Sequence, residues 1–122
     1  MTLPRQHKRI LLALDGHALA RELPSNVVRH CVHLCPRLDI LLINPPREPT
    51  SILAVLLLRL EHSGVDYRMA SSHGQMGEEI LRYLARYPGI QAVALADPAQ
   101  LDAESSRLIE LKGHQVLFLG EG

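Results

Sequence analysis

Five short apolar runs, separated by segments with helical spacing, constrain the fold of this chain more than any other feature. Four of the runs are almost continuously apolar, which is typical of strands that are covered on both faces of a parallel sheet. The third run alternates between apolar and polar residues, which predicts an edge strand with one wetter side. The runs are Arg9–Leu14, Asp39–Ile43, Asp66–Ala70, Ile90–Leu95 and Gln115–Leu119.

Helical patterns fill the intervals between these runs. Glycine or a Pro-Gly pair ends the last three patterns, as expected at the carboxyl end of a helix. The alternation of strands and helices predicts one α/β domain over residues 1–122, a doubly wound, three-layer α/β/α arrangement with a five-stranded parallel sheet. The expected helices span about Ala18–Cys35, Thr50–His62, Gln75–Tyr87 and Ala99–Lys112.

The overall composition narrows the possible partners. Thirteen Lys and Arg residues balance 13 Asp and Glu residues, so the chain lacks the positive excess that general nucleic-acid affinity requires. The longest apolar run, Ile52–Leu58, is far shorter than the roughly 20 residues of a membrane span. The basic start is not followed by the apolar stretch of a signal peptide. We therefore expect a soluble, cytoplasmic protein that binds neither nucleic acid nor a membrane.

Polar residues follow three of the apolar runs. In a doubly wound sheet, ligands bind beside the carboxyl ends of the strands at the switch point, so these residues are our ligand-binding candidates. The turn after the fourth run offers a carboxylate and a proline without an N–H, whereas a phosphate site requires glycines and free backbone N–H groups. The candidates are Asp15, Gly16 and His17 after the first run, Asn44 after the second and Asp97 after the fourth.

Two interpretations of the aspartates stay open. Asp15 and Asp97 could face one another across the crevice and hold a cation, with His17 or a water completing the site. Alternatively, Asp97 caps the fourth helix, with Pro98 at its first position, and Asp15 caps the first helix or braces a turn.

Two further motifs contain residue types found in metal or catalytic sites. His30–Cys35 reads HCVHLC, but its cysteines and histidines lie on different faces of the expected first helix, so we expect no metal site. Ser71–Glu79 reads SSHGQMGEE and holds Ser72, His73 and Glu78 without the nucleophile elbow of a hydrolase. We interpret this stretch as a strand-to-helix turn and assign no catalytic residue.

Three stretches of the sequence resemble the universal stress protein family. They are KRILLALDGH, GVDYRMASSHGQMGEEILRYLARYPGIQAVAL and HQVLFLG, and the spacing fits nearly the whole chain. The resemblance implies a parallel sheet of order 3-2-1-4-5, of the adenine nucleotide alpha hydrolase-like type, and a dimer often paired through the last strand. It also places Asp15 where members that bind ATP hold the adenine.

Family members that bind ATP carry a glycine-rich loop after the fourth strand, G-x-x-G followed by nine residues and then G-S/T. The matching stretch here, ADPAQLDAESSRLIELKG, has no glycine before Gly113. The resemblance therefore predicts a member that does not bind ATP and that uses no cofactor.

Two surfaces are expected to meet partners. The second helix is apolar on almost all sides over Ile52–Leu58, which indicates either a covering protein partner or a deeply packed helix. The last strand, Gln115–Leu119, is an edge strand in the implied order, and its unpaired N–H and C=O groups favour pairing in a homodimer.

Three functions remain open. The first is a non-enzymatic module of the universal-stress-protein type that acts in stress response or regulation through dimerisation and protein contacts. The second is a sensor whose crevice holds a nucleoside, another small molecule or a cation at Asp15, Asn44 and Asp97. The third is a hydrolase that works from Asp15 and His17 by acid–base chemistry.

Overall fold

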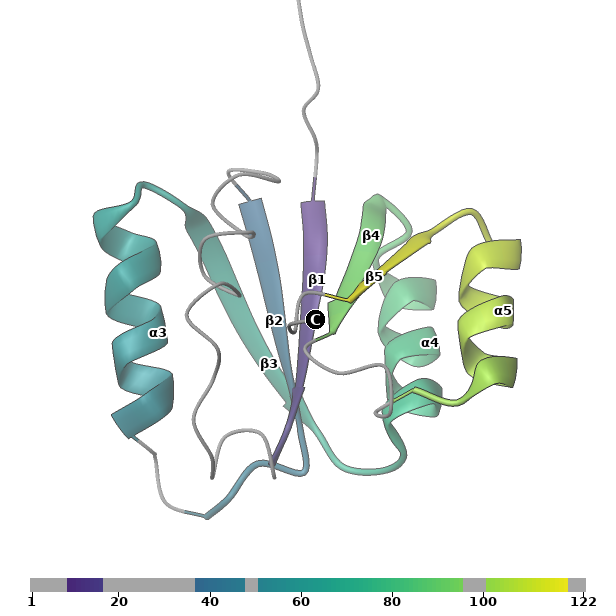
Figure 1. The fold of residues 1–122 in the computed structure, drawn as a ribbon, viewed down its shortest axis with the longest axis horizontal. Coiled ribbons are helices and arrows are strands. Elements are labelled where there is room, and N and C mark those ends of the chain that lie inside the picture. The colour runs from purple at the N-terminus through teal and green to yellow at the C-terminus, as the bar shows by residue number, and fades with distance from the viewer. Residues whose placement is uncertain (1–8, 17–36, 48–50, 96–100, 119–122) are drawn as a thin grey trace, which may run out of the picture.

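A parallel sheet of five strands forms the middle layer of the fold (Figure 1). The computed structural model describes residues 9–16, 37–47, 51–95 and 101–118. The strand order β3-β2-β1-β4-β5 and the parallel pairing confirm the predicted doubly wound sheet. The strands are β1 (Arg9–Asp15), β2 (Arg37–Ile43), β3 (Asp66–Ser72), β4 (Ile90–Leu95) and β5 (Gln115–Phe118).

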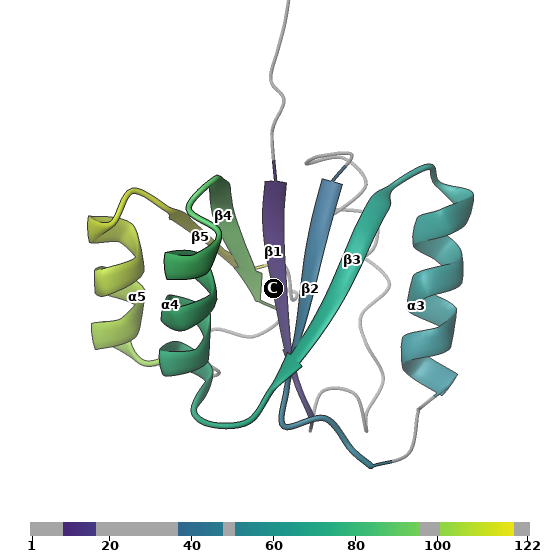
Figure 2. The same ribbon diagram turned by 180° about the vertical axis from the view of Figure 1, so that it is seen from behind.

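Helices pack on both faces of the sheet, as Figures 1 and 2 show from opposite sides. One face carries α3 (Ser51–His62), and the other carries α4 (Met76–Arg86) and α5 (Ala103–Leu111). These three helices confirm the ones predicted after the second, third and fourth strands. The helix predicted over Ala18–Cys35, with the HCVHLC motif, lies outside the described residues.

Both faces of the central strands are buried, which explains why their sequences are apolar without interruption. In β1, Leu12 belongs to the core cluster that contains Leu56 of α3. Its neighbour Leu11 belongs to the opposite cluster, which contains Ile80 of α4 and Ile109 of α5. All five side chains are at most 3% exposed, and each contributes about 1.5–3 kcal/mol by leaving water.

The two edge strands expose apolar side chains. β3 lies at one edge, as its alternating sequence predicts, and Met69 on it is 44% exposed. β5 lies at the other edge, and Phe118 at its end is 43% exposed. Leu119, the last residue predicted for this strand, lies outside the described residues.

The start of α5 corrects one prediction. Asp102 is the N-cap residue of this helix, and its carboxylate accepts a hydrogen bond of 3.0 Å from the Ser105 N–H. Because Asp102 already satisfies the helix start, the interpretation of Asp97 as the cap of this helix, with Pro98 at its first position, is wrong. Asp97 itself lies outside the described residues.

Helix α3 is buried on one side only. Leu56 and Leu60 are at most 3% exposed, whereas Val55 is 50% exposed and Leu58 is 54% exposed. The alternative of a deeply packed helix is therefore wrong for Val55 and Leu58. Although α3 is rich in apolar residues, no described helix has the length and apolar character needed to cross a membrane.

A buried carboxylate joins three strands and a helix. Asp39 in β2 is fully buried and accepts hydrogen bonds from Arg9 Nη1 at 2.9 Å, Arg68 Nε at 3.1 Å and the Tyr83 hydroxyl at 2.8 Å. Burial and the hydrogen bond to Asp39 raise the pKa of Tyr83 to about 12. Arg68 also lies over the ring of Tyr87, 4.6 Å from its centre. Since the carboxylate is paired on both oxygens, this network is structural.

Candidate functional site

A cavity of about 340 Å³ lies at the carboxyl ends of β1 and β2. This is the position where ligands bind in doubly wound sheets. The cavity brings together three predicted site residues, Asp15, Gly16 and Asn44, while His17 and Asp97 lie outside the described residues. The remaining lining residues are Ile43, Pro46 and Met76. We call this cavity the carboxyl-end crevice.

Asn44 braces the wall of the crevice with its side chain. Its Nδ2 donates to the Gly74 carbonyl at 2.8 Å, and its Oδ1 accepts from the Gly74 N–H at 3.0 Å. Its own N–H donates to the Ser72 carbonyl at 2.8 Å. The φ of 52° at Asn44 is left-handed, a conformation that asparagine tolerates better than most residues. The amide thus ties the end of β2 to the loop after β3.

Gly16 lets the ends of β1 and β2 approach closely. A Cβ atom at this position would lie 2.1 Å from the Asn44 carbonyl oxygen, which no real contact allows. The glycine that follows the first strand is therefore explained by backbone packing. A phosphate ligand is not needed to account for it.

A second polar cluster, formed by Ser72, Glu79 and Arg82, holds the segment that joins β3 to α4. Glu79 is 5% exposed, its carboxylate accepts a hydrogen bond from the Ser72 hydroxyl, and Arg82 Nη1 lies 2.7 Å from Oε2. The Ser72 hydroxyl is the main cause that lowers the pKa of Glu79, and the charge of Arg82 adds to it against the opposing effect of burial. A carboxylate held in this way is a weak base.

The contacts of Ser72 differ from those of an activated serine. The hydroxyl donates to Glu79, whereas Glu78 and the intervening His73 are exposed. An activated serine donates its proton to a histidine that a carboxylate in turn orients. This geometry agrees with the interpretation of the SSHGQMGEE stretch as a turn.

The charge of the crevice favours cationic or neutral ligands. Among its described lining residues, Asp15 is acidic and none is basic. A carboxylate beside a phosphate would repel it. Within the part of the chain that the structure describes, no three His, Cys, Asp or Glu residues converge in a way that could hold a metal ion.

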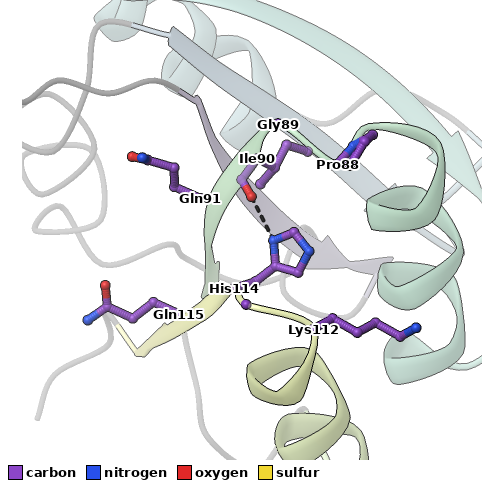
Figure 3. A pocket seen from close by; sticks show the side chains of 8 residues that line it. Pro88, Gly89, Ile90, Gln91, Lys112, His114 and Gln115 are labelled. Atoms are coloured by element: carbon purple, nitrogen blue, oxygen red, sulfur yellow. Dashed lines mark hydrogen bonds between the residues drawn. The ribbon is translucent and has the colours of Figure 1, made fainter.

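A second cavity, of about 450 Å³, lies at the opposite end of the sheet, where β4 and β5 begin (Figure 3). We call it the amino-end pocket. His114 is 8% exposed, and its Nδ1 lies 2.6 Å from the Ile90 carbonyl oxygen. The lining residues are Pro88, Gly89, Ile90, Gln91, Lys112, Gly113, His114 and Gln115.

The amino-end pocket is not evident from the sequence. The only signal was a histidine directly before a predicted strand, beside Lys112 and Gly113. The pocket depends on the contact of His114 with Ile90, 24 residues away in the sequence, so its walls come together only in the folded sheet.

Two solved structures share this fold at low sequence identity. The universal stress protein UspA from Lactobacillus plantarum has a TM-score of 0.56 and 14% identity, over 95% of this chain and 99% of that chain. Shikimate dehydrogenase from Mycobacterium tuberculosis has a TM-score of 0.51 and 14% identity, over 91% of this chain and 44% of that chain. No protein-family model and no curated protein matches the sequence. The likeness shows a UspA-like α/β fold, and function must be argued from the sites.

Proposed function

We propose that the chain is a non-enzymatic, universal-stress-protein-like module that acts in stress response or regulation, in the cytoplasm, through dimerisation and protein contacts. The fold likeness to UspA supports the class of protein. The composition of the carboxyl-end crevice supports a module without ATP, because its described lining residues include a carboxylate and no basic side chain.

The edge position of β5 is the main observation that supports the proposed dimer. It pairs with β4 on one side and ends the sheet on the other. Its four residues, Gln115–Phe118, carry no charge, and charges are a common device that prevents pairing between edge strands. A second copy of the chain, related by a two-fold axis, would continue the sheet through its own β5.

The dimer is tested by sedimentation velocity over a range of protein concentrations. We expect wild type to sediment as a dimer and Phe118→Lys as a monomer, because a charge on the edge opposes pairing. Leu111→Lys is the matched control, since Leu111 is 74% exposed on α5 and lies outside the strand. A wild-type protein that stays monomeric at every concentration contradicts the dimer.

Protein contacts are assigned to the outer surface of α3. Val55 and Leu58 are each at least half exposed on this surface, and exposed apolar patches commonly mark interaction sites. Calorimetry with ATP tests whether the module binds this nucleotide. Affinity in the low micromolar range would contradict the proposal that it does not.

A second candidate function is a sensor of a small neutral molecule or a cation in the carboxyl-end crevice. The meeting of Asp15, Gly16 and Asn44 in a cavity of about 340 Å³ favours it, since ligand pockets are commonly about 300–1,000 Å³. Thermal-shift measurements with adenosine and with Mg²⁺ separate the two ligand classes.

Two isosteric variants, one in the crevice and one outside it, test whether the sensor uses Asp15. Asp15→Asn should abolish any stabilisation by the ligand, whereas Asp66→Asn, at the exposed start of β3, should preserve it. If neither adenosine nor Mg²⁺ stabilises the protein, the sensor function is contradicted.

A further inference from the structure

The amino-end pocket holds a buried nitrogen atom that can accept a hydrogen bond and has no donor among the described residues. A carbonyl oxygen can only accept, so the Nδ1 atom of His114, 2.6 Å from the Ile90 carbonyl oxygen, carries a proton. In the neutral imidazole the other ring nitrogen, Nε2, is then an acceptor. Within the described ranges of the chain, Nε2 makes no hydrogen bond. Because His114 is 8% exposed and buried polar atoms are nearly always paired, this nitrogen requires a donor from a ligand or from water.

The titratable side chains around the imidazole do not supply this donor. The Lys112 side chain extends away from the ring in Figure 3. Tyr87, at the end of α4, stacks with Tyr83. Arg9, in the neighbouring strand β1, bonds to Asp39.

The backbone around the imidazole also offers acceptors rather than donors. Helices α4 and α5 both end at this side of the sheet, and the carboxyl end of a helix carries a partial negative charge. An anion is disfavoured here, whereas the positive end of an N–H dipole is favoured. Four backbone N–H groups at the pocket already donate to carbonyls, namely those of Ile90, Lys112, Gly113 and His114.

The rim of the pocket has the opposite character. Lys112, Gln91 and Gln115 line the pocket and are exposed, and each of these side chains ends in N–H donors. No acidic residue is among the described lining residues, so a cationic ligand would meet the Lys112 charge without a counter-ion. A ligand that suits both parts carries no net charge, donates inward to Nε2 and accepts outward.

We propose that the amino-end pocket binds an uncharged primary carboxamide, whose N–H group donates to His114 Nε2 and whose carbonyl oxygen faces the donors at the rim. A carboxamide holds two N–H donors and a carbonyl acceptor in one plane, so a single group meets both requirements. The cavity volume of about 450 Å³ lies in the usual range of ligand pockets, about 300–1,000 Å³. This site is independent of the dimer and of the carboxyl-end crevice.

The test is an NMR titration of the full chain with three probes of similar shape, benzamide, N,N-dimethylbenzamide and benzoate, at about pH 7.5, where most histidine side chains are neutral. We expect saturable shifts of the Gly89 and Gly113 amides with benzamide. N,N-dimethylbenzamide keeps the ring and the carbonyl but lacks the N–H groups, so its affinity should be about fivefold lower. Benzoate should also bind about fivefold more weakly than benzamide, because the helix carboxyl ends oppose its charge.

A lower pH gives a second readout in wild type. The imidazolium has no acceptor nitrogen, so the affinity for benzamide should fall about fivefold at about pH 5.5. The weaker affinity for N,N-dimethylbenzamide should stay the same, because this probe does not use Nε2.

A matched pair of variants locates the contact. His114→Asn keeps an N–H group near the Nδ1 position for the Ile90 carbonyl but removes Nε2, so it should lower the affinity for benzamide about fivefold. His62→Asn, at the exposed end of α3, should leave the affinity unchanged. The comparison of the three probes in wild type decides the proposal even if His114→Asn does not fold.

Three results would overturn the proposal. The first is the absence of saturable Gly89 and Gly113 shifts with benzamide at the higher pH. The second is equal affinity for benzamide and N,N-dimethylbenzamide. The third is binding of benzoate as tightly as benzamide.

Discussion

The carboxyl-end crevice and the amino-end pocket lie at opposite ends of one sheet and differ in the charge of their described lining residues. The crevice presents the Asp15 carboxylate, and its Asn44 amide is already bonded to Gly74. The pocket presents Lys112 and an imidazole whose Nε2 is unbonded among the described residues. The fold type favours the first as a ligand site, whereas the unsatisfied polar chemistry favours the second. The position that the fold favours for a ligand and the buried histidine with an unbonded ring nitrogen among the described residues therefore lie at different ends of the sheet.

The structural supports of the two ends also differ. Toward the amino end, Asp39 is held by two arginines and a tyrosine from different elements. At the carboxyl end, Glu79 is held by Ser72 and Arg82. Substitutions in the Asp39 network and in the Glu79 network compare how much each end contributes to the free energy of unfolding.

Asp39→Asn should have the largest effect. It leaves Arg9 and Arg68 without their buried carboxylate, and loss of one partner from such a network costs about 3 kcal/mol. Urea unfolding at neutral pH measures the change. Asp66→Asn removes the same charge from the exposed start of β3 and should change the free energy of unfolding by less than about 0.5 kcal/mol. Equal effects of the two substitutions would contradict the structural role of Asp39.

Gly16→Ala should have the next largest effect. The added Cβ would lie 2.1 Å from the Asn44 carbonyl oxygen, so the strand ends must separate at a cost of about 1–3 kcal/mol. Gly89→Ala is the control at the other end of the sheet, because its Cβ would meet nothing within 4 Å. Chemical unfolding of both variants should show a large loss only for Gly16→Ala.

Acid should weaken the carboxyl end. Ser72 and Arg82 lower the pKa of Glu79 in the folded chain. The folded pKa therefore lies below the unfolded value, so this contribution is present above the unfolded pKa and is lost as the pH falls through the folded one. Unfolding measured from neutral to acidic pH should show a shallower decline for Glu79→Gln than for wild type. Identical acid profiles would contradict the prediction.

Alkali should weaken the amino end. Burial and Asp39 raise the pKa of Tyr83 to about 12, from 10.0. The contribution of Tyr83 is complete below the unfolded pKa and is lost as the pH rises through the folded pKa. Tyr83→Phe should flatten the stability profile between these two values. Tyr67→Phe is the comparison, since the hydrogen bond to Glu61, and not to Asp39, raises the pKa of Tyr67, and it should flatten the profile less than Tyr83→Phe does.

The central sheet was predictable because its strands are buried on both faces. Leu11 and Leu12 point to opposite clusters, so the sequence of β1 is apolar at consecutive positions. The meeting of Asp15, Gly16 and Asn44 was predictable for a related reason, since the carboxyl ends of neighbouring parallel strands lie together.

The supports and the pocket were not predictable from local patterns. Asp39 finds its partners 29, 30 and 44 residues away, and no periodicity reports such contacts. The cap of α5 was misassigned because Asp97 and Asp102 are both plausible caps by residue type, and only the helix start distinguishes them.

The unequal edges of the sheet limit how far copies of this chain can associate. β3 carries Asp66 and Arg68, and Arg68 is held by Asp39, while β5 is uncharged. A fibre needs every subunit to pair through both edges of its sheet. In a pairing of β5 with β5, each subunit uses only its β5 edge. The proposed pairing through β5 would therefore close at two subunits and leave the charged edge facing water.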